Sequence, residues 1–568
     1  MTDKFPDAEI IKRQSDYLRG TVAEGLDDLA TGAISDDDTK LTKFHGTYLQ
    51  DDRDLRDERR RQKLEPLYMF MVRLRLPGGV LTPQQWLGLD AIADECANHT
   101  LRLTTRQTFQ FHGVFKPRMR TFMQRVNALG LDTKGACGDD NRNVIANVNP
   151  HHSDLHAEIH RLSTEISERL MWRSGAYAEI WLGEERVHSL GGDEEEEPFY
   201  RHYYLPRKFK IALAIPPEND CDVLANDIGL IAIVEDGRLA GFNVAVGGGM
   251  GLTYGNAATY PRLAEEAGFV PAEQIVDACV AIAAIQRDHG CRTDRSHARF
   301  KYTLDDHGMD WFLERFAEYH GTPMAAAREY RFSHNGDRFG WVEGENGNRH
   351  LTLMIQSGRI ADTENYRLRT ALREIAELHS GEFRVTCNQN LMIANVTPEQ
   401  QARIQAIIDR HGLDDGSHST PLARNAMSCV AFPTCGLAMA ESERYLPGLV
   451  EALDALMAGH GLAETPINVR VTGCPNGCAR PYLAEIGLSG KAIDKYNLYL
   501  GGDERGQRMN RLYRENIDTA TILAILDPLL GRYAAEREAG EGFGDFLVRA
   551  GIVDAERPPE VFHIAYSA

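Results

Sequence analysis

The sequence predicts an α+β fold with a pseudo-twofold duplicated architecture, in which two ferredoxin-like halves and two larger mixed α/β lobes surround a central site. Length is the first reason, because 568 residues exceed what one hydrophobic core usually holds. The second reason is a strand–helix–strand–helix unit, typical of a ferredoxin-like half, that occurs twice along the chain. Matching motifs follow both copies, which indicates that the whole architecture is duplicated.

The first ferredoxin-like unit can be followed element by element. The run MFMVRLRL alternates as a strand does, with Arg73 and Arg75 on its polar face. A helix is expected to begin after Thr82, because threonine can cap a helix and the proline that follows suits its first turn. The stretch LRLTTRQTFQFHG predicts a second strand, with Arg102 and Arg106 on its polar face, and another amphipathic helix follows.

The second copy is recognised by its motifs. RLTTRQ, which begins at Arg102, aligns with RVTCNQ, which begins at Arg384, at an offset of 282. The pair Arg142-Asn143 aligns with Arg424-Asn425 at the same offset. Because two matches share one offset and their flanking elements also agree, they indicate a duplication rather than chance.

These patterns divide the chain into five expected segments. The N-terminal segment is dense in charge and ends in QDDRDLRDERRRQKL, which is typical of a solvated helical arm. The segments are this polar arm (1–64), a ferredoxin-like half (65–135), a first lobe (136–340), a second ferredoxin-like half (341–415) and a second lobe (416–568).

Composition limits the classes of function. Lys and Arg total 63 and Asp and Glu total 83, which gives a formal net charge of −20 and argues against a general nucleic-acid binder. The N-terminus has no apolar signal segment, and no apolar run reaches the roughly 18 residues that a membrane span needs. We therefore expect a cytoplasmic protein whose ten cysteines are not structural disulfides.

Basic residues gather on the polar faces of the predicted strands. Between the two copies, LPRKFKIALAI predicts an apolar strand with Lys208 and Lys210 together on its other face. No carboxylate alternates with the basic residues on these faces, and buried cations without an anion are unfavourable. Such strands would form a concave basic surface that suits a polycarboxylate cofactor, a small oxyanion, or both. The residues concerned are Arg73, Arg75, Arg102, Arg106, Lys208 and Lys210.

Four cysteines near the C-terminal end form the most specific pattern. Cys429 and Cys435 are spaced C-x5-C, and Cys474 and Cys478 follow 38 residues later as C-x3-C. Four thiolates from two tight loops can hold one iron–sulfur cubane. The alternative is a four-thiolate zinc site, but zinc knuckles usually have shorter gaps than the first pair. Asn476-Gly477 predicts a tight turn that exposes Cys478 at its tip.

Several motifs together resemble those of a known family. The stretches RQSDYLRG, FHGTYLQDDRD, RLRLPGGV, RLTTRQTFQFHG, DDNRNV, YLPRKFK, FPTCGLAMAE, VTGCPNGC and EREAGEGFGDF resemble the haemoprotein (beta) subunits of assimilatory NADPH-dependent sulfite reductases, in the nitrite/sulfite reductase family. The likeness runs nearly end to end. It implies a sirohaem bridged to a [4Fe–4S] cluster through one cysteine thiolate, with sirohaem and substrate in the first lobe and the cluster in the second.

The resemblance also implies roles for individual residues. Cys429, Cys435, Cys474 and Cys478 would ligate the cluster, and Cys478 would be shared with the sirohaem iron. Sulfite binding and proton supply would fall to four cations, namely Arg73, Arg142, Lys208 and Lys210. The sirohaem would also be held by Arg102, Arg106, Arg207 and Asn476.

The implied activity is the six-electron reduction of sulfite to sulfide, in sulfate assimilation and cysteine biosynthesis. GGGMGLTYG does not continue as a dinucleotide-binding motif and no P-loop occurs, so nicotinamide and flavin chemistry is expected on another protein. The resemblance implies a diflavin (FAD/FMN) NADPH-dependent reductase alpha subunit, and hence a hetero-oligomer.

Three alternatives to this function stay open. A sirohaem nitrite reductase shares the fold and cofactors, although Lys210 favours sulfite because nitrite enzymes of the family tend to have a neutral residue there. A ferredoxin-dependent sulfite reductase would differ in its electron donor. A non-catalytic scaffold with a structural zinc ion or cluster would have neither sirohaem nor sulfite-dependent activity.

Overall fold

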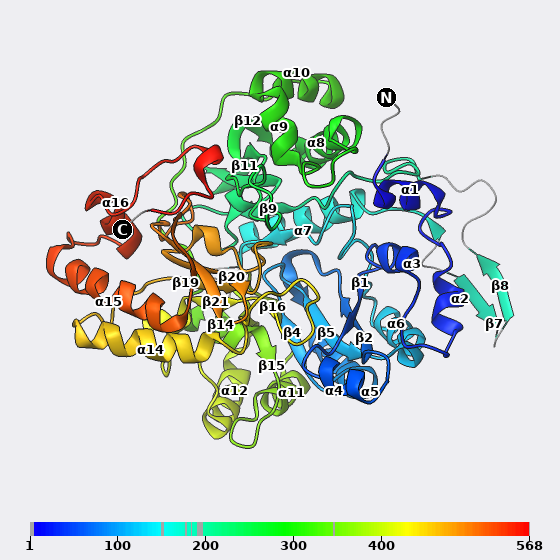
Figure 1. The fold of residues 1–568 in the computed structure, drawn as a ribbon, viewed down its shortest axis with the longest axis horizontal. Helices are drawn as coiled ribbons and strands as arrows, with labels where there is room; N and C mark the ends of the chain where they lie inside the picture. The colour runs from blue at the N-terminus through cyan, green and yellow to red at the C-terminus, as the bar shows by residue number, and fades with distance from the viewer. Residues whose placement is uncertain are drawn as a thin grey trace.

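The computed structural model of the protein describes residues 5–148, 153–175, 179–182, 185–189, 197–344 and 347–566. Within these ranges the strands form four five-stranded sheets and one two-stranded sheet. Figure 1 shows two of the large sheets close together at the bottom of the view, one in the lobe at the top and one in the lobe at the left. The predicted class, α+β with duplicated halves and lobes, is confirmed. No helix in the described ranges is long and apolar enough to cross a membrane.

The two ferredoxin-like halves exchange an edge strand. Their sheets have the orders β1-β2-β5-β4-β15 and β13-β14-β17-β16-β3. β15 comes from the second half but pairs with β4 of the first, and β3 of the first half pairs with β16 of the second. The halves are therefore interlocked by backbone hydrogen bonds. Their strands are β1 (Thr47–Asp51), β2 (Tyr68–Arg73), β3 (Val80–Leu81), β4 (Leu101–Leu103), β5 (Phe109–Val114), β13 (Gly340–Glu343), β14 (Arg349–Leu353), β15 (Arg359–Ile360), β16 (Glu382–Val385) and β17 (Leu391–Val396).

Helices cover these two sheets and share one core. Thr82 caps the first helix through a capping box with Gln85, as expected from the sequence, and Thr397 caps a helix of the second half in the same way. Trp86 stacks on Phe383 of the other half with ring centroids 4.7 Å apart, and the apolar residues of both halves form one continuous cluster. The helices are α5 (Pro83–Cys96), α6 (Met119–Ala128), α11 (Leu368–Leu378) and α12 (Pro398–His411).

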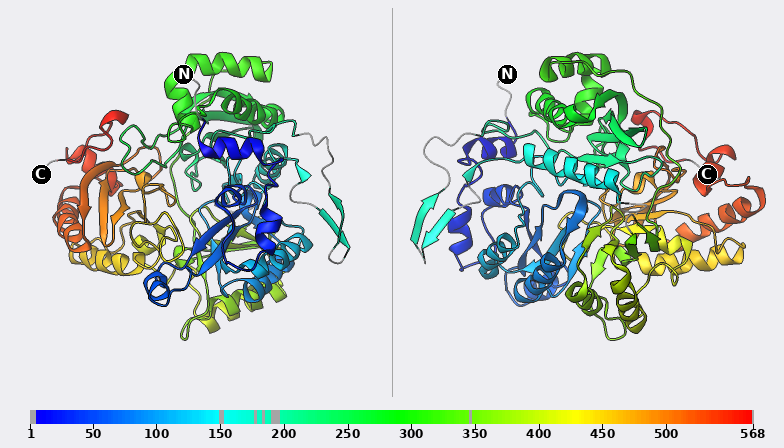
Figure 2. Two further views of the ribbon diagram at one scale, coloured as in Figure 1. Left: turned by 45° about the vertical axis from the view of Figure 1, so that its right-hand side comes forward. Right: turned by 180° about the vertical axis from the view of Figure 1, so that it is seen from behind.

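The two lobes contain sheets of the same topology. Lobe 1 has the order β6-β9-β10-β11-β12 and lobe 2 the order β18-β19-β20-β21-β22, with two parallel pairings followed by two antiparallel ones in each. In Figures 1 and 2 the lobes border each other and the interlocked halves. The strands are β6 (Ile145–Ala146), β9 (Ile211–Ala214), β10 (Ile228–Glu235), β11 (Arg238–Val246), β12 (Glu265–Pro271), β18 (Ala426–Ser428), β19 (Val469–Thr472), β20 (Ile486–Ala492), β21 (Lys495–Leu500) and β22 (Arg511–Ile517).

Register fixes how the two lobes correspond. Ile211 pairs with Ile228 in lobe 1, and Val469 pairs with Ile486 in lobe 2, so the central strands correspond at an offset of 258. The remaining elements complete the layers. They are α7 (Asp154–Arg169), β7 (Glu179–Leu182), β8 (Glu185–Ser189), α8 (Ile275–His289), α9 (Phe300–His307), α10 (Met309–His320), α13 (Pro421–Arg424), α14 (Leu446–Gly459), α15 (Thr519–Glu536) and α16 (Phe543–Arg549).

Two sequence expectations differ from the structure. The stretch LRLTTRQTFQFHG is not one strand but two antiparallel strands, in which Arg102 pairs with Gln110 across a turn that contains Arg106. The N-terminal arm is not a free solvated segment, because its strand β1 joins the first half and Leu18, Leu41 and Phe44 are buried in the core of lobe 1. The arm also contains α1 (Asp7–Gln14), α2 (Val22–Asp27), α3 (Asp36–Leu41) and α4 (Arg56–Arg61).

Candidate active site between the lobes

The four cysteines lie close together in lobe 2. Cys429 follows β18 directly, Cys474 comes two residues after the end of β19, and these two strands are neighbours in the sheet. Burial, followed by the neighbouring thiols, raises the pKa of Cys429 and Cys474 to about 12 and that of Cys435 to about 11. Thiolates raise the pKa of one another only when their sulfur atoms are close together. A positively charged metal group beside them would have the opposite effect and favour the thiolates.

Backbone and arm residues shape the two cysteine loops. The N–H group of Gly473 donates to Sγ of Cys429 over 3.2 Å, and Nδ2 of Asn476 donates to Sγ of Cys474 over 3.4 Å. Gly477 has a φ of +64°, and Cys478 at the end of this turn is exposed, as the sequence predicts. Arg53 of the N-terminal arm donates to the carbonyl oxygens of Cys435 and Ala438 over 3.0 and 2.7 Å, so the arm clamps the first loop.

A four-thiolate zinc site, the alternative to a cluster, would require a specific arrangement of the cysteines. A four-thiolate zinc site needs all its sulfur atoms about 2.3 Å from one ion. Among the described residues, no group of three or more His, Cys, Asp or Glu side chains is arranged to hold a single metal ion. The two loops do bring four thiols to one place, which is the donor set of a cubane cluster.

Lys208 and Lys210 lie across from these loops. Both side chains are half-buried, on either side of the fully buried Phe209 and just before β9. Burial, then the charges of Arg299, Arg207 and Arg142, lower the pKa of Lys208 to about 7, while Cys478 acts to raise it. The N–H group of Leu252 in lobe 1 donates to the carbonyl oxygen of Pro475 over 3.2 Å, and the hydroxyl of Thr105 donates to the carbonyl oxygen of Cys478 over 3.0 Å. The cations and the cysteines of lobe 2 therefore border the same space.

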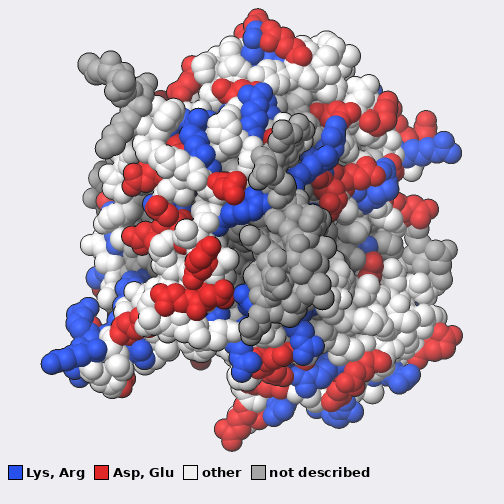
Figure 3. Space-filling model, turned by 90° about the vertical axis from the view of Figure 1, so that its right-hand side faces the viewer, with Lys and Arg blue, Asp and Glu red and all other residues white. Residues whose placement is uncertain are grey.

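Positive charge is concentrated in this interior region. Burial lowers the pKa of Lys210 well below its ordinary value, and Lys208 and Arg106 lower it further. None of the hydrogen bonds or ion pairs described for the chain uses Nζ of Lys208 or Lys210. On the outer face shown in Figure 3, by contrast, acidic and basic side chains are interspersed.

Arg73 and Arg142 meet at one loop beside this region. Both donate to the carbonyl oxygen of Ala136, over 3.5 and 3.3 Å, and Arg73 also contacts Sγ of Cys137 at 3.4 Å. Arg142 further donates to the carbonyl oxygen of Gly138 from Nε and Nη2, at 3.1 and 2.8 Å. Nε of Arg73 is buried without a hydrogen-bond partner. The structure thus brings these two predicted residues together.

Arg106 and Arg207 complete the set of cations. Arg106 donates to Oδ1 of Asn226 over 2.6 Å and to backbone carbonyls, yet its Nε is buried without a partner. Burial is the largest cause that lowers the pKa of Arg106 to about 9 and that of Arg207 to about 10. Arg207 lies 3.9 Å from Asp139, which also pairs with Arg295 and Lys12. After burial, repulsion from neighbouring arginines lowers both pKa values further.

Two of the predicted basic residues are ion-paired instead. Arg75 binds Asp132 and Glu168 at 2.6 and 2.7 Å, so it does not contribute to the basic surface. Arg102 binds Glu443 at 3.0 Å and donates to the carbonyl oxygen of Ser428 over 3.1 Å. Their carboxylates come from distant segments, which is why alternation along one strand gave no sign of them. Arg102 therefore lies beside the loop of Cys429 and shares the carboxylate of Glu443 with Arg359.

The sequence interpretation missed a buried acid and two cations. Asp227 is fully buried, accepts from the backbone N–H of Lys210 over 3.0 Å and pairs with Arg299 at 3.0 Å. Lys301 donates to the carbonyl oxygens of Gly249 and Gly251 over 3.1 and 2.9 Å, which fixes the glycine-rich segment after β11. The sequence did contain a signal for Arg299 and Lys301, because basic residues flank a phenylalanine in RFK, which begins at Arg299, as they do in RKFK, which begins at Arg207.

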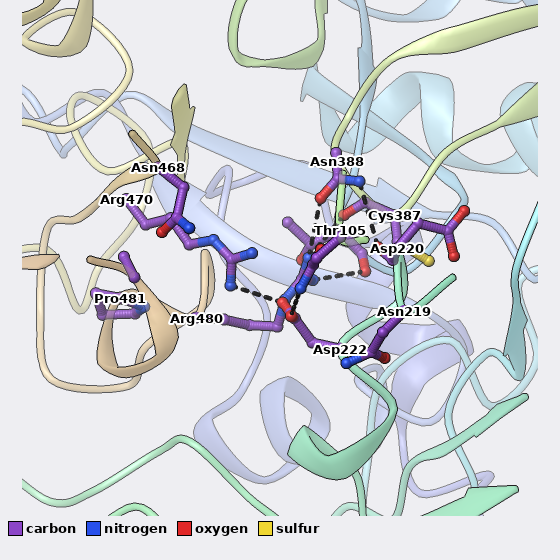
Figure 4. Close-up of polar contacts among 12 residues, drawn as sticks. Thr105, Asn219, Asp220, Asp222, Cys387, Asn388, Asn468, Arg470, Arg480 and Pro481 are labelled. Carbon is purple, nitrogen blue, oxygen red and sulfur yellow. Dashed lines mark hydrogen bonds and ion pairs between the residues drawn. The ribbon is translucent and has the colours of Figure 1, made fainter. Parts of the chain in front are cut away.

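A buried ion cluster joins the lobes near their pseudo-twofold axis. Asp222 accepts from Nη1 of Arg470 over 2.6 Å, from Nδ2 of Asn335 over 2.6 Å and from Nε of Arg480. Figure 4 shows both arginines pointing toward Asp222. Asp222 and Arg480 correspond at the offset of 258, and both have left-handed backbone, with φ of 46° and 55°. Arg480 also donates to the carbonyl oxygens of Thr105 and Cys387, which correspond at the offset of 282.

These offsets show what replaces the cysteines in lobe 1. Asn147 corresponds to Cys429 at the offset of 282, and Asp220 corresponds to Cys478 at the offset of 258. Both side-chain amide atoms of Asn147 are buried without hydrogen-bond partners. Lobe 2 therefore provides the thiols, whereas lobe 1 and the first ferredoxin-like half provide the cations.

The residues present fit the two groups that the sequence resemblance implies. Unpartnered guanidinium nitrogens on Arg73, Arg106 and Arg299, together with the unpaired ammonium groups, suit a polycarboxylate ligand and an oxyanion. The four neighbouring thiols suit an iron–sulfur cluster. Cys478, which is exposed and whose carbonyl oxygen accepts from Thr105 beside Arg106, is the thiol at the border of the two groups.

Known proteins resemble the chain over nearly its whole length. A family model described as the nitrite/sulfite reductase ferredoxin-like half domain matches residues 61–129 and 342–411. A second, described as the nitrite and sulphite reductase 4Fe-4S domain, matches residues 165–324, which lie in lobe 1 and do not include the four cysteines of lobe 2. Mycobacterium tuberculosis NirA has a similar fold, with a TM-score of 0.75, 24% identity and coverage of 95% of this chain and 96% of that one.

Curated relatives are closer in sequence. The sulfite reductase [NADPH] hemoprotein beta-component of Staphylococcus haemolyticus is 57% identical and covers 99% of this chain and 98% of its own. The proteins of the same name from Myxococcus xanthus and Geobacillus thermodenitrificans are 56% and 54% identical, over 96% and 98% of this chain and 97% of each relative. The chain therefore belongs to the family of sulfite reductase [NADPH] hemoprotein beta-components.

Proposed function

We propose that the protein reduces sulfite to sulfide, as the haemoprotein component of an assimilatory NADPH-dependent sulfite reductase that serves cysteine biosynthesis. The proposal rests on the meeting of cationic and thiol groups across the lobes, where the Cys474–Cys478 loop is hydrogen-bonded to Leu252 of lobe 1 and to Thr105 beside Arg106. Neither group of residues alone defines an enzyme. Together they form a site for an anionic redox cofactor with a substrate anion on its cationic side.

The residues divide into three sets by the contacts that we assign to them. Cys429, Cys435, Cys474 and Cys478 would hold the [4Fe–4S] cluster, with Cys478 shared with the sirohaem iron. Arg106, Arg207 and the backbone near Asn476 would hold the sirohaem carboxylates and edge, and Arg102 would support the Cys429 loop while paired with Glu443. Arg73, Arg142, Lys208 and Lys210 would surround sulfite.

The chemistry divides between cofactors and protein. When bound, the sirohaem and the cluster supply the redox chemistry, since they can accept and pass on single electrons. The overall reaction converts hydrogen sulfite, six electrons and six protons into the hydrogen sulfide anion and three water molecules. The protein positions the substrate anion among fixed cations, which offset its charge without reorganisation. Lys208, with a pKa lowered to about 7, is poised to give up a proton near neutral pH.

The cationic set favours sulfite over nitrite. Sulfite is doubly charged when fully ionised, whereas nitrite carries one charge, so a second lysine at position 210 matters more for sulfite. Burial and Lys208 lower the pKa of Lys210, so its protonated form is favoured most by a ligand of high negative charge. A nitrite reductase is the second candidate function because its cofactors and fold would be the same.

We assign electron supply to a diflavin subunit that oxidises NADPH. The chain belongs to a family whose members are named beta-components of NADPH enzymes, which supports a partner subunit within a hetero-oligomer. All ten cysteines lie in the described part of the chain and all are free, which supports the expectation of a reducing cytoplasm. A ferredoxin donor would require no NADPH-oxidising partner.

A redox titration of the purified holoenzyme tests the function. With chemically reduced viologen as donor, we expect six one-electron equivalents to be consumed for each sulfide released. NADPH should replace viologen only when a diflavin reductase is added. A holoenzyme that consumes no viologen on addition of sulfite, or that consumes fewer than six equivalents and releases a partly reduced sulfur product, would contradict the proposal.

A further inference from the structure

A cavity of about 140 Å³ lies on the other side of the pseudo-twofold axis from the candidate active site. It is lined by the segment 333–337, by the turn of the second ferredoxin-like half and by strand ends of lobe 2. This volume is roughly ten times what one water molecule needs, but it is far below the space that a large cofactor occupies. The cavity therefore suits a small organic molecule.

Residue correspondence shows that this cavity is the duplicate of the candidate active site. Arg106 and Arg142 correspond at the offset of 282 to Asn388 and Arg424, and both of these line the cavity. At the offset of 258, Lys208 and Lys210 correspond to Pro466 and Asn468, which also line it. Three of four cations have become neutral residues, so the duplicate has lost the charge that would suit a polyanion.

Two arginines keep local positive charge at the cavity. Arg424 is half-buried, and only its Nη1 forms a hydrogen bond within the described part of the chain, to the carbonyl oxygen of Gly416 over 3.0 Å. Arg470 is 4% exposed, and its Nε is buried without a hydrogen-bond partner. Since Arg470 and Arg480 share the single carboxylate of Asp222, one positive charge remains uncompensated there.

Three carboxyl groups line the same cavity, those of Asp337, Glu485 and Glu504, and of these three only Glu485 is buried. Glu485 is 2% exposed and accepts from the backbone N–H groups of Asn468 and Gly544, each over 2.9 Å. Its counterpart in lobe 1, Asp227, is balanced by Arg299, whereas no ion pair of Glu485 occurs among the described residues. Burial, followed by its acidic neighbours, raises the pKa of Glu485 to about 7. A cationic group in the cavity would relieve this cost.

We propose that this cavity binds a small polar α-amino acid, with its carboxylate toward Arg424 and its ammonium group toward Glu485. A simple anion would add negative charge beside Glu485, Asp337 and Glu504, whereas a simple amine would make no use of Arg424. The amides of Asn388, Asn425 and Asn468 supply hydrogen-bonding groups for a polar side chain. The duplicated architecture thus gives one catalytic site and one binding site for a ligand of different charge.

Isothermal titration calorimetry on the cofactor-loaded protein tests this site. The probes are L-serine, which has both charges, and acetate and methylammonium, which have one each. We expect L-serine to bind and each singly charged probe to bind at least about tenfold more weakly, because each lacks one charge-assisted contact. Arg424→Gln should weaken L-serine binding at least about tenfold. Arg403→Gln, an equal change of charge at an exposed position on α12, should not affect it.

A second measurement needs no variant. A ligand that binds only the folded protein raises its thermal midpoint as its concentration increases. L-serine should raise the midpoint of the wild-type protein, whereas acetate and methylammonium at equal concentration should raise it less. Equal effects of all three probes, no binding of L-serine at tens of millimolar, or full retention of binding by Arg424→Gln would each overturn the proposal.

Discussion

Asp222→Asn should be among the most destabilising single substitutions outside the apolar core. The Asp222 side chain is fully buried, and its carboxylate is the shared acceptor of two buried guanidinium groups, Arg470 and Arg480. Burial alone would raise the pKa of Asp222, but these two arginines hold it below its ordinary value. Asparagine keeps the shape and one acceptor atom but removes the charge, so both guanidinium groups stay buried without a counter-charge.

The expected loss follows from that geometry. Breaking a buried ion pair by removing one partner typically costs about 3–5 kcal/mol. For lobes of this size, such a loss lowers the thermal midpoint by roughly 10 °C. The loss of the Asp222 charge should also disturb the cofactor site, because Arg480 lies two residues after Cys478. Arg480 donates to the carbonyl oxygen of Thr105, and the hydroxyl of Thr105 donates to the carbonyl oxygen of Cys478.

Differential scanning calorimetry at pH 7 measures the change. The matched control is Asp54→Asn, which removes an acid that pairs with Arg444 at 2.6 Å on the surface, where such pairs contribute about 1 kcal/mol or less. Asp222→Asn together with Arg470→Met should lose less than Asp222→Asn alone, since one unpaired charge is gone. If Asp222→Asn and the surface control shift the midpoint equally, the buried ion cluster does not join the lobes as we argue.

Three further predictions concern single residues. Glu443→Gln should leave Arg102 without its buried counter-charge, cost about 2 kcal/mol and lower the acid-labile sulfide content, whereas Glu441→Gln nearby should not. Glu485 has a pKa of about 7, above the ordinary value of 4.5, so its stabilising contribution is present below about pH 4.5 and is lost as the pH rises through 7. Between these two pH values, the free energy of unfolding of Glu485→Gln, measured in urea, should rise by about 3 kcal/mol relative to that of the wild type. Lys210→Asn should lower kcat/KM for sulfite more than for nitrite, and an unchanged ratio in steady-state assays would contradict its role beside the substrate.

Local patterns were sufficient to predict the architecture. The offset of 282 identified both ferredoxin-like halves, because a turn motif and its flanking elements repeat there with matching residues. The duplication of the lobes left a weaker signal, because Phe242-Asn243 and Gly247-Gly248 repeat as Tyr496-Asn497 and Gly501-Gly502 at an offset of 254, whereas Ile228-Gly229-Leu230 repeats as Ile486-Gly487-Leu488 at 258. The exchange of β3 and β15 between the halves could not be foreseen, because an edge pairing of two residues leaves no periodic signal.

The candidate site was predictable where its chemistry depends on spacing. The four cysteines stood out because their loops are short, and Lys208 and Lys210 because they alternate with Phe209. The partners of Arg75 and Arg102 were not predictable, since Asp132, Glu168 and Glu443 approach only after the chain folds. A basic residue on a predicted strand is therefore a weak indicator of a binding site until its acidic neighbours are known.

We propose that the cations of lobe 1 and of the first ferredoxin-like half face the same cofactor assembly as the thiols of lobe 2. The visible spectrum of the protein as purified, with acid-labile sulfide measured on the same sample and sulfite then added, tests this most directly. We predict sirohaem absorption, about four sulfide ions per chain and a spectral change that saturates with sulfite. A well-folded but colourless protein, or a coloured one whose spectrum does not respond to sulfite, would contradict it.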